Sequence, residues 1–183
     1  RIVAAPTAGS CGVVPAVFLT LEEEKHFTEE KMVEALYVAA GIGGVIANRA
    51  FLAGAAGGCQ AEIGSASAMA AGGVAYLMGG DAVQVSHAAA LALKNLLGLA
   101  CDPVAGLVEV PCVKRNVMGA VNALTSADMV MAGITSKIPP DEGIDAMRAI
   151  GRSMSEDIRE TGKGGLAGTP TGVAIRERMA GTL

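Results

Sequence analysis

Residues 58–81 read GCQAEIGSASAMAAGGVAYLMGGD, and the architecture of the chain follows from them. No charged side chain occurs between Glu62 and Asp81, and Ala, Gly and Ser make up most of the run. A run of this length reaches the span of a lipid bilayer, but a membrane helix would contain fewer small and polar residues. We therefore expect a buried helix over 59–78 at the centre of a globular domain, and no membrane partner.

Helical spacing of apolar residues continues on both sides of this run, and no alternating strand pattern is found. Thr28 and Asp81 are suited to cap helices, and Pro111 is suited to the first position of one. The helices expected besides 59–78 cover 13–24, 28–48, 81–99, 111–133 and 141–161, with a short terminal helix after the turn 162–165. The sequence predicts one all-α domain over 1–183, a compact bundle of about six to eight helices.

Three glycines, Gly41, Gly43 and Gly44, fall in the middle of the helix expected over 28–48. Each costs about 1 kcal/mol relative to Ala in an exposed helix. Their presence predicts either close helix packing or a break in the helix.

Composition narrows the class of protein. Of the 183 residues, 51% are hydrophobic but only 3% are aromatic, so the core must be built from small and aliphatic side chains. The net charge of -4 comes without a dense Lys/Arg cluster, which excludes nucleic acid as an expected partner. Four cysteines and no export signal predict a reducing compartment, the cytoplasm. Because Arg1 stands where an initiator Met is expected, the chain looks N-terminally truncated.

Cys59, Cys101 and Cys112 are each expected where a loop meets a helix end, although they lack the CxxC spacing of a zinc ribbon or ferredoxin. Cys59 and Cys112 would lie at helix N-termini, where the dipole and free amides lower the pKa of a thiol. Spacing alone leaves two interpretations open, a shared metal site or three separately buried small hydrophobes.

Five segments decide between these interpretations, because together they resemble the alpha chain of iron-sulfur L-serine dehydratases. They are PTAGSCGVVPA at 6–16, GCQAEIG at 58–64, CDPVAG at 101–106, VPCVKRN at 110–116 and RETGKGGL at 159–166. The resemblance runs through nearly the whole chain in the same order, and CDPVAG followed by VPCxxRN is a specific signature.

The resemblance implies an all-helical catalytic domain whose cofactor is a [4Fe-4S] cluster bound by Cys59, Cys101 and Cys112. One iron then has no protein ligand and can act as a Lewis acid in eliminating water from L-serine, which gives pyruvate and ammonia without pyridoxal phosphate. The tail cysteine of some fused relatives is missing here. This implies a two-chain lyase with a separate beta chain as partner, in an oligomer.

Substrate and base are expected in different places. Thr7 and Ser10 lie in a loop before a helix and are suited to contact the carboxylate of L-serine, although an ordinary capping turn would use the same residues. The catalytic residue on this chain is unknown, because the resemblance assigns the base to a His in the beta chain. His26 reads as a surface residue and His87 as a structural one.

For several residues close to the cysteines in sequence, two roles remain possible. Glu62 either faces the cluster or is a helix-start carboxylate. Asp102 is suited to cap its own turn, and Lys114, Arg115 and Asn116 either contact the cluster or belong to a subunit interface. The turn 162–165 is either a closing segment or an ordinary linker.

Three other functions compete with a dehydratase. A related lyase such as a cysteine desulfidase would release sulfide in place of hydroxide. A redox sensor or structural cluster protein would bind all four irons and show no response to substrate. A helical binding domain would contain no metal.

Overall fold

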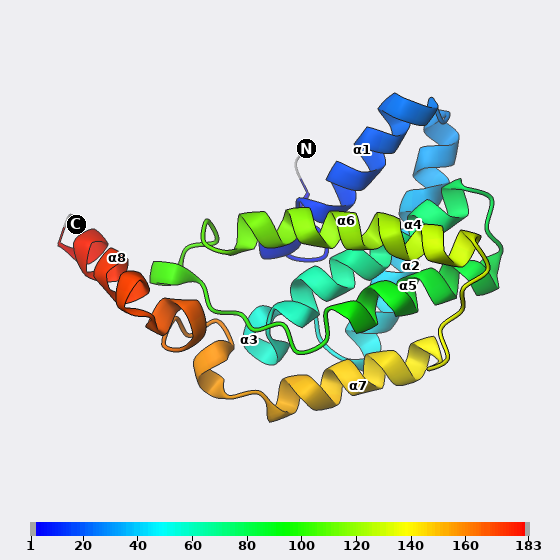
Figure 1. Cartoon of the computed structure of the whole chain (residues 1–183). Helices are drawn as coiled ribbons and strands as arrows, with labels where there is room; N and C mark the ends of the chain where they lie inside the picture. The colour runs from blue at the N-terminus through cyan, green and yellow to red at the C-terminus, as the bar shows by residue number, and fades with distance from the viewer. Residues whose placement is uncertain (1–2, 182–183) are drawn as a thin grey trace.

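The computed structural model describes residues 3–181 and confirms the all-α prediction (Figure 1). The helices are α1 (Val13–Lys25), α2 (Glu29–Arg49), α3 (Gly54–Gly57), α4 (Ser65–Leu77), α5 (Ala82–Asn95), α6 (Cys112–Met131), α7 (Pro140–Ser153) and α8 (Pro170–Ala180). Between them lie a π-helical turn, Gln60–Gly64, and short 3-10 turns at Ala8–Ser10, Val104–Gly106, Glu156–Ile158 and Gly165–Gly168. Within residues 3–181 the β pairing is confined to one isolated bridge, between Cys101 and Arg159.

Helix α4 is the centre of the bundle, as its uncharged sequence predicts. Every residue of α4 except Tyr76 is buried. Helices α1, α2, α5 and α6 all pack against it, and Figure 1 shows α6 and α5 crossing in front of it. No helix in the described part of the chain is long and apolar enough to cross a membrane.

The glycines of α2 have different surroundings. The helix runs unbroken from Glu29 to Arg49, so the predicted break is wrong. Close packing is confirmed at Gly43, where an added Cβ would lie 2.9 Å from the sulfur of Met69. Gly41 and Gly44 have nothing within 4 Å of such a Cβ, so they make no close packing contact.

Both predicted N-caps are confirmed. Thr28 Oγ1 accepts a hydrogen bond from Lys31 N at 3.3 Å. Asp81 and Gln84 form a capping box, in which each side chain accepts from the other residue's backbone amide. Caps of this kind contribute about 1 kcal/mol to helix stability.

The predicted helix over 141–161 is wrong at its C-terminal end. Helix α7 ends at Ser153, and the chain continues as an extended residue and a 3-10 turn. The reason is tertiary, because the backbone here pairs with Cys101. Cys101 N donates to Ile158 O at 2.9 Å, and Glu160 N donates to Cys101 O at 2.7 Å.

Two other boundaries differ by a few residues. Helix α5 ends at Asn95 instead of 99, since Gly98 N donates to Gln60 Oε1 at 2.9 Å outside the helix. Helix α6 begins at Cys112, and Pro111 is the residue just before it.

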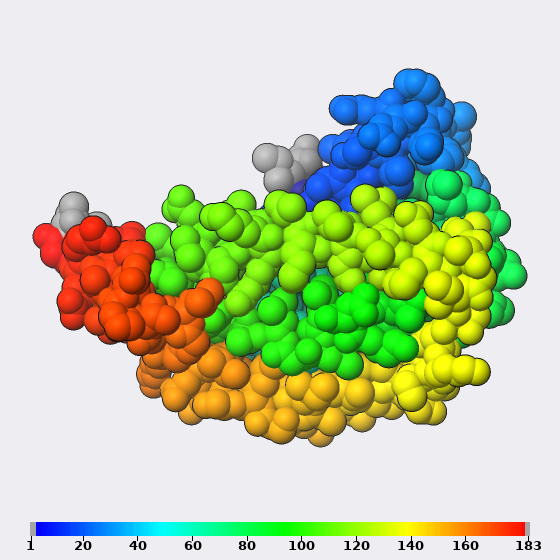
Figure 2. All heavy atoms as spheres, in the orientation of Figure 1, coloured from blue at the N-terminus to red at the C-terminus, as the bar shows by residue number. Residues whose placement is uncertain are grey.

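The C-terminal segment projects from the bundle. Figure 2 shows α8 and the turns before it as an arm that continues from the end of α7 and reaches the beginning of α6. Helix α8 packs on the 3-10 turns Val104–Gly106 and Gly165–Gly168. This arm therefore lies beside the segment that carries Cys101 and Cys112.

Candidate metal centre

Three cysteine side chains meet inside the chain. Cys59 precedes the π-helical turn, Cys101 lies in the bridged segment, and Cys112 is the first residue of α6. Their exposed fractions are 1%, 2% and 5%. The Sγ atoms of Cys59 and Cys101 lie within 4.8 Å of each other, and the Cys112 thiol interacts with that of Cys59 from the other chain junction. Junctions of loops and helices thus bring three sulfurs together, as expected from the sequence.

The backbone around Cys59 explains this convergence. Gly58 has a φ of 76°, and a Cβ there would lie 2.7 Å from Leu99 O, so a side chain is excluded both by strain and by space. Gln60 N donates to the same Leu99 carbonyl at 3.0 Å. The turn that carries Cys59 is therefore fixed directly against the segment leading to Cys101.

The expectation of lowered thiol pKa values is wrong for the free thiols. The interaction with the Cys101 thiol, together with burial, raises the pKa of Cys59 to about 12, although the interaction with Cys112 opposes this. The interaction with Cys59 and burial also raise the pKa of Cys112. Mutual contact and desolvation of the sulfurs disfavour their charged forms.

Arg115 is the cation of the site. Its Nη1 donates to Asp102 Oδ1 at 2.8 Å and to Ala100 O at 2.7 Å, and it lies 3.7 Å from Cys59 Sγ. Burial lowers the pKa of Arg115, but the hydrogen bond and charge of Asp102 outweigh this and raise it. Arg115 therefore stays charged beside the sulfur.

The sequence suggested that Asp102 caps its own turn, but its side chain bonds other segments instead. It is only 4% exposed, and its Oδ2 accepts a hydrogen bond from Leu166 N at 2.8 Å. The carboxylate thus joins α6 to the C-terminal arm.

Glu62 lies in the first turn of the π-helical segment and also faces the Cys59 and Cys101 thiols, so both features that its sequence position suggested are present. The ligand atoms of Cys59, Glu62 and Cys101 all lie within 4.8 Å of one another. Glu62 is 8% exposed, and burial raises the pKa of its carboxyl, although a hydrogen bond from Thr7 opposes this. It could serve a metal as ligand or as neighbour.

The loop before α1 lies next to Glu62. Thr7 Oγ1 donates to Glu62 Oε1 at 2.6 Å, and the Thr7 and Ser10 hydroxyls are 3.1 Å apart. Ser10 is fully buried. The structure places both residues beside the cysteines, and their contact with substrate stays a prediction.

Asn116 has a role that the sequence did not reveal. Its side chain holds the loop before α1 to the start of α6: Oδ1 accepts from Gly12 N at 3.0 Å, and Nδ2 donates to Gly9 O at 2.8 Å and to Cys112 O at 2.9 Å. Only its position one turn after Cys112 could have suggested this.

The remaining candidates lie apart from the site or are exposed. Cys11 and His26 are exposed. His87 Nδ1 accepts from Ser136 N at 3.3 Å, a structural contact as predicted. Lys114, next to Arg115, is exposed.

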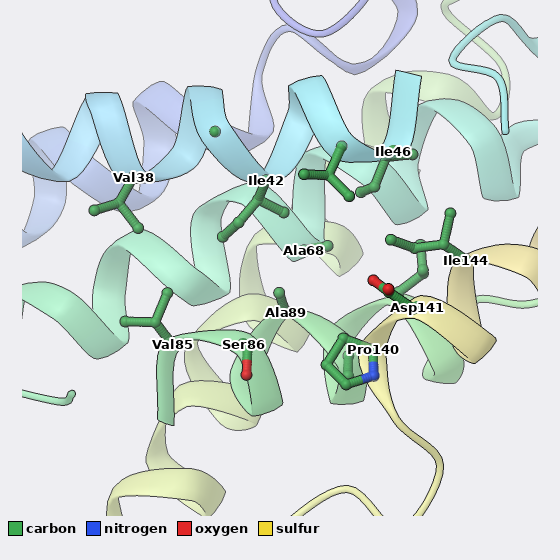
Figure 3. A pocket seen from close by; sticks show the side chains of 14 residues that line it. Val38, Ile42, Ile46, Ala68, Val85, Ser86, Ala89, Pro140, Asp141 and Ile144 are labelled. Atoms are coloured by element: carbon green, nitrogen blue, oxygen red, sulfur yellow. The ribbon is translucent and has the colours of Figure 1, made fainter. Parts of the chain in front are cut away.

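A separate cavity of about 350 Å³ lies between α2, α5 and α7 (Figure 3). Val38, Ile42 and Ile46 of α2 point into it, and the first turn of α7 lies opposite. Asp141 is the one charged residue of the lining, and no cysteine contributes to it. This cavity is a gap over the apolar core and has none of the groups that characterise the cysteine site.

Comparison with known proteins identifies the family of the chain. The sequence model of the family described as "Serine dehydratase alpha chain" matches residues 1–167. The chain belongs to this family. All three clustered cysteines, Glu62 and Arg115 fall within the matched region, whereas α8 lies beyond it.

Individual relatives carry the same name. Over 98% of this chain, the sequence is 57% identical to a probable L-serine dehydratase alpha chain of Bacillus subtilis and spans 60% of that protein. A probable L-serine dehydratase alpha chain of Latilactobacillus sakei is 54% identical over 98% of this chain and 86% of its own length. An L-serine dehydratase of Escherichia coli is 42% identical over 91% of this chain, which spans 37% of it.

Proposed function

We propose that this chain is the cluster-binding catalytic part of an L-serine dehydratase, which eliminates water from L-serine to give pyruvate and ammonia. The observation that carries the proposal is the meeting of Cys59, Cys101 and Cys112 in one buried site beside a cationic Arg115. Family membership supports the same conclusion, because the relatives named above are L-serine dehydratases.

The donor set suits a [4Fe-4S] cluster. Thiolates are its usual protein ligands, and Cys59, Cys101 and Cys112 supply three. The other cysteine, Cys11, is exposed and is not among the residues that meet at the site. When bound, such a cluster supplies a Lewis-acidic iron that stabilises a departing hydroxide.

The chain's own residues then orient the substrate. Thr7 and Ser10 are the proposed contacts for L-serine, and Glu62 holds the Thr7 hydroxyl through the bond at 2.6 Å. Removal of the α-proton by a base and departure of the hydroxyl group give aminoacrylate, and hydrolysis of its imine form gives pyruvate and ammonia. We place the base on a beta chain.

Anaerobic reconstitution with iron and sulfide tests the proposal. Visible and electron paramagnetic resonance spectra are recorded with and without L-serine, and iron bound per chain is measured. Cys59→Ala, Cys101→Ala and Cys112→Ala should each lose the cluster, and Cys11→Ala is the matched control that keeps it. A cluster that is indifferent to the three substitutions would contradict the ligand assignment.

The substrate is tested with the two chains together. Pyruvate formed from L-serine supports a dehydratase, whereas sulfide released from L-cysteine with no turnover of L-serine would indicate a desulfidase. A cluster whose spectrum does not respond to L-serine would favour a structural or redox role.

A further inference from the structure

The carboxylate of Asp102 has two different partners, one on each oxygen. Oδ1 accepts from Arg115 Nη1 and Oδ2 accepts from Leu166 N, both at 2.8 Å. The side chains of Asp102 and Arg115 are 5% and 16% exposed, so water screens their ion pair little. Breaking either bond would leave the buried Asp102 carboxylate without one of its two partners.

The partner on the Oδ2 side belongs to the segment that encloses Cys101. Residues 158–160 pair with the backbone of Cys101 on both sides, and Gly164 N donates to Asp157 O at 2.9 Å. Gly165 has a φ of 58°, and a Cβ there would collide with the Asp102 carboxylate. Only glycine therefore lets the turn at Gly165 and Leu166 close onto Asp102.

The partner on the Oδ1 side reaches the cysteines. Arg115 Nη1 is held between Asp102 and Ala100 O, and this places the guanidinium 3.7 Å from Cys59 Sγ. A positive charge at this distance stabilises negative charge on the sulfur.

We propose that Asp102 is a positioning residue that holds Arg115 against the Cys59 ligand and ties the turn at Gly165 and Leu166 to the segment that carries Cys101. The part that concerns the ligand rests on the proposed function. Because a fixed cation favours the more negatively charged state of a cluster, Arg115 raises the reduction potential of the cluster, and Asp102 keeps it there.

The tie to the turn is tested on the full chain without metal, by hydrogen exchange of the Leu166 amide. Asp102→Ala should speed this exchange at least about tenfold, since the amide loses its buried acceptor. Asp102→Asn keeps an acceptor oxygen and should restore slow exchange. Unchanged exchange at Leu166 in Asp102→Ala would overturn the tie, whatever the chain does with iron.

The hold on Arg115 is tested by the reduction potential of the reconstituted cluster. Arg115→Met should lower the potential, and Lys114→Met is the matched control, because it removes the same charge at the next position from an exposed side chain. The control should shift the potential by less than half as much. Equal shifts would overturn the contact role of Arg115.

A double-mutant cycle separates positioning from simple charge. Loss of the Asp102 charge alone raises the potential, and this is the result expected for Asp102→Ala in the Arg115→Met background. In the parent chain the same substitution should lower the potential, because Arg115 leaves Cys59. An equal rise in both backgrounds would overturn positioning. Failure to bind any cluster would overturn the proposed function. The exchange rate of the Leu166 amide would still test its hydrogen bond to Asp102, because that measurement needs no metal.

Discussion

Gln60 donates a hydrogen bond from Nε2 to the carbonyl oxygen of Met147 over 3.0 Å, in the fully buried interior between the cysteine site and α7. Its Oε1 accepts from Gly98 N at 2.9 Å. One amide side chain, next to Cys59 in sequence, therefore fixes both α7 and the loop that leads to Cys101. The position of the candidate ligands depends on this polar contact inside an apolar bundle.

Replacing Gln60 by Ala should destabilise the metal-free chain by about 3 kcal/mol, because the buried Met147 carbonyl loses a donor, the Gly98 amide loses its acceptor and a cavity forms in the core. Urea unfolding followed by circular dichroism measures this. Gln84→Ala is the matched control: its amide bonds only the exposed N-cap of α5, and about 1 kcal/mol or less should be lost. Equal losses would show that burial of Gln60 does not matter.

Much of this fold could be predicted because it depends on local signals. The uncharged run of α4 indicates a buried helix, and Thr28 and Asp81 mark helix starts through their own side chains. The end of α7 could not be predicted in this way. Residues 154–161 have helical spacing, but the backbone bonds of 158 and 160 to Cys101 outweigh it, and a sequence pattern contains no information about that partner.

The candidate site was predictable to a similar degree. Cys59, Cys101 and Cys112 stand at chain junctions that the sequence marks, but spacing left their meeting open, and only the resemblance to the serine dehydratase alpha chain predicted a shared site. The hydrogen bonds around the site could not be predicted, because their partners are distant in sequence. Asp102 bonds Leu166, which is 64 positions away, and Asn116 bonds Gly9, which is 107 positions away. Nor could spacing reveal that contact between the thiols raises their pKa values.

The glycines give a second prediction about stability. Gly41→Ala should stabilise the chain by about 0.5–1 kcal/mol, because the position is helical, exposed and free of neighbours within 4 Å. Gly73→Ala should destabilise it by about 1–3 kcal/mol, since the new methyl group would collide with the Phe18 ring in the core. Thermal unfolding of the two variants and the parent measures both stability changes. The same sign of change in both variants would contradict the packing described for α2 and α4.

Thr7 gives a prediction about substrate. Thr7→Val keeps the shape of the side chain but removes the hydrogen bond to Glu62 Oε1. If the Thr7 hydroxyl also contacts L-serine, as proposed above, KM for L-serine should rise about tenfold, the effect of losing one hydrogen bond to substrate of about 1.4 kcal/mol. Thr7→Ser keeps the hydroxyl and is the control that should stay near the parent value. If kcat falls in Thr7→Val while KM is unchanged, Thr7 does not help to bind ground-state L-serine.

The carboxyl of Glu62 leads to a prediction about pH. Burial raises the pKa of Glu62 above its ordinary value of 4.5, so the native state holds a proton that the unfolded chain releases. Below pH 4.5 the Glu62 carboxyl is protonated in both the native and the unfolded state, so it does not lower the free energy of unfolding. As pH rises through the window from 4.5 to the raised native value, stability is lost. Glu62→Gln, which keeps an oxygen for Thr7, should therefore be more stable than the parent at pH 8 and equal to it at pH 4.

Glu34 supplies a control of opposite sign. Hydrogen bonds from Tyr76 and Lys31 to its carboxylate lower the pKa of Glu34, although partial burial opposes them. Its contribution to stability is present above the ordinary pKa of 4.5 and is lost as pH falls through the lowered native value. Glu34→Gln should therefore lose stability at pH 8, where Glu62→Gln gains it, and urea unfolding of the metal-free variants at both pH values measures the difference. A loss of stability in Glu62→Gln at pH 8 would mean that the buried carboxylate is held in its charged form by the site, against the effect of its burial.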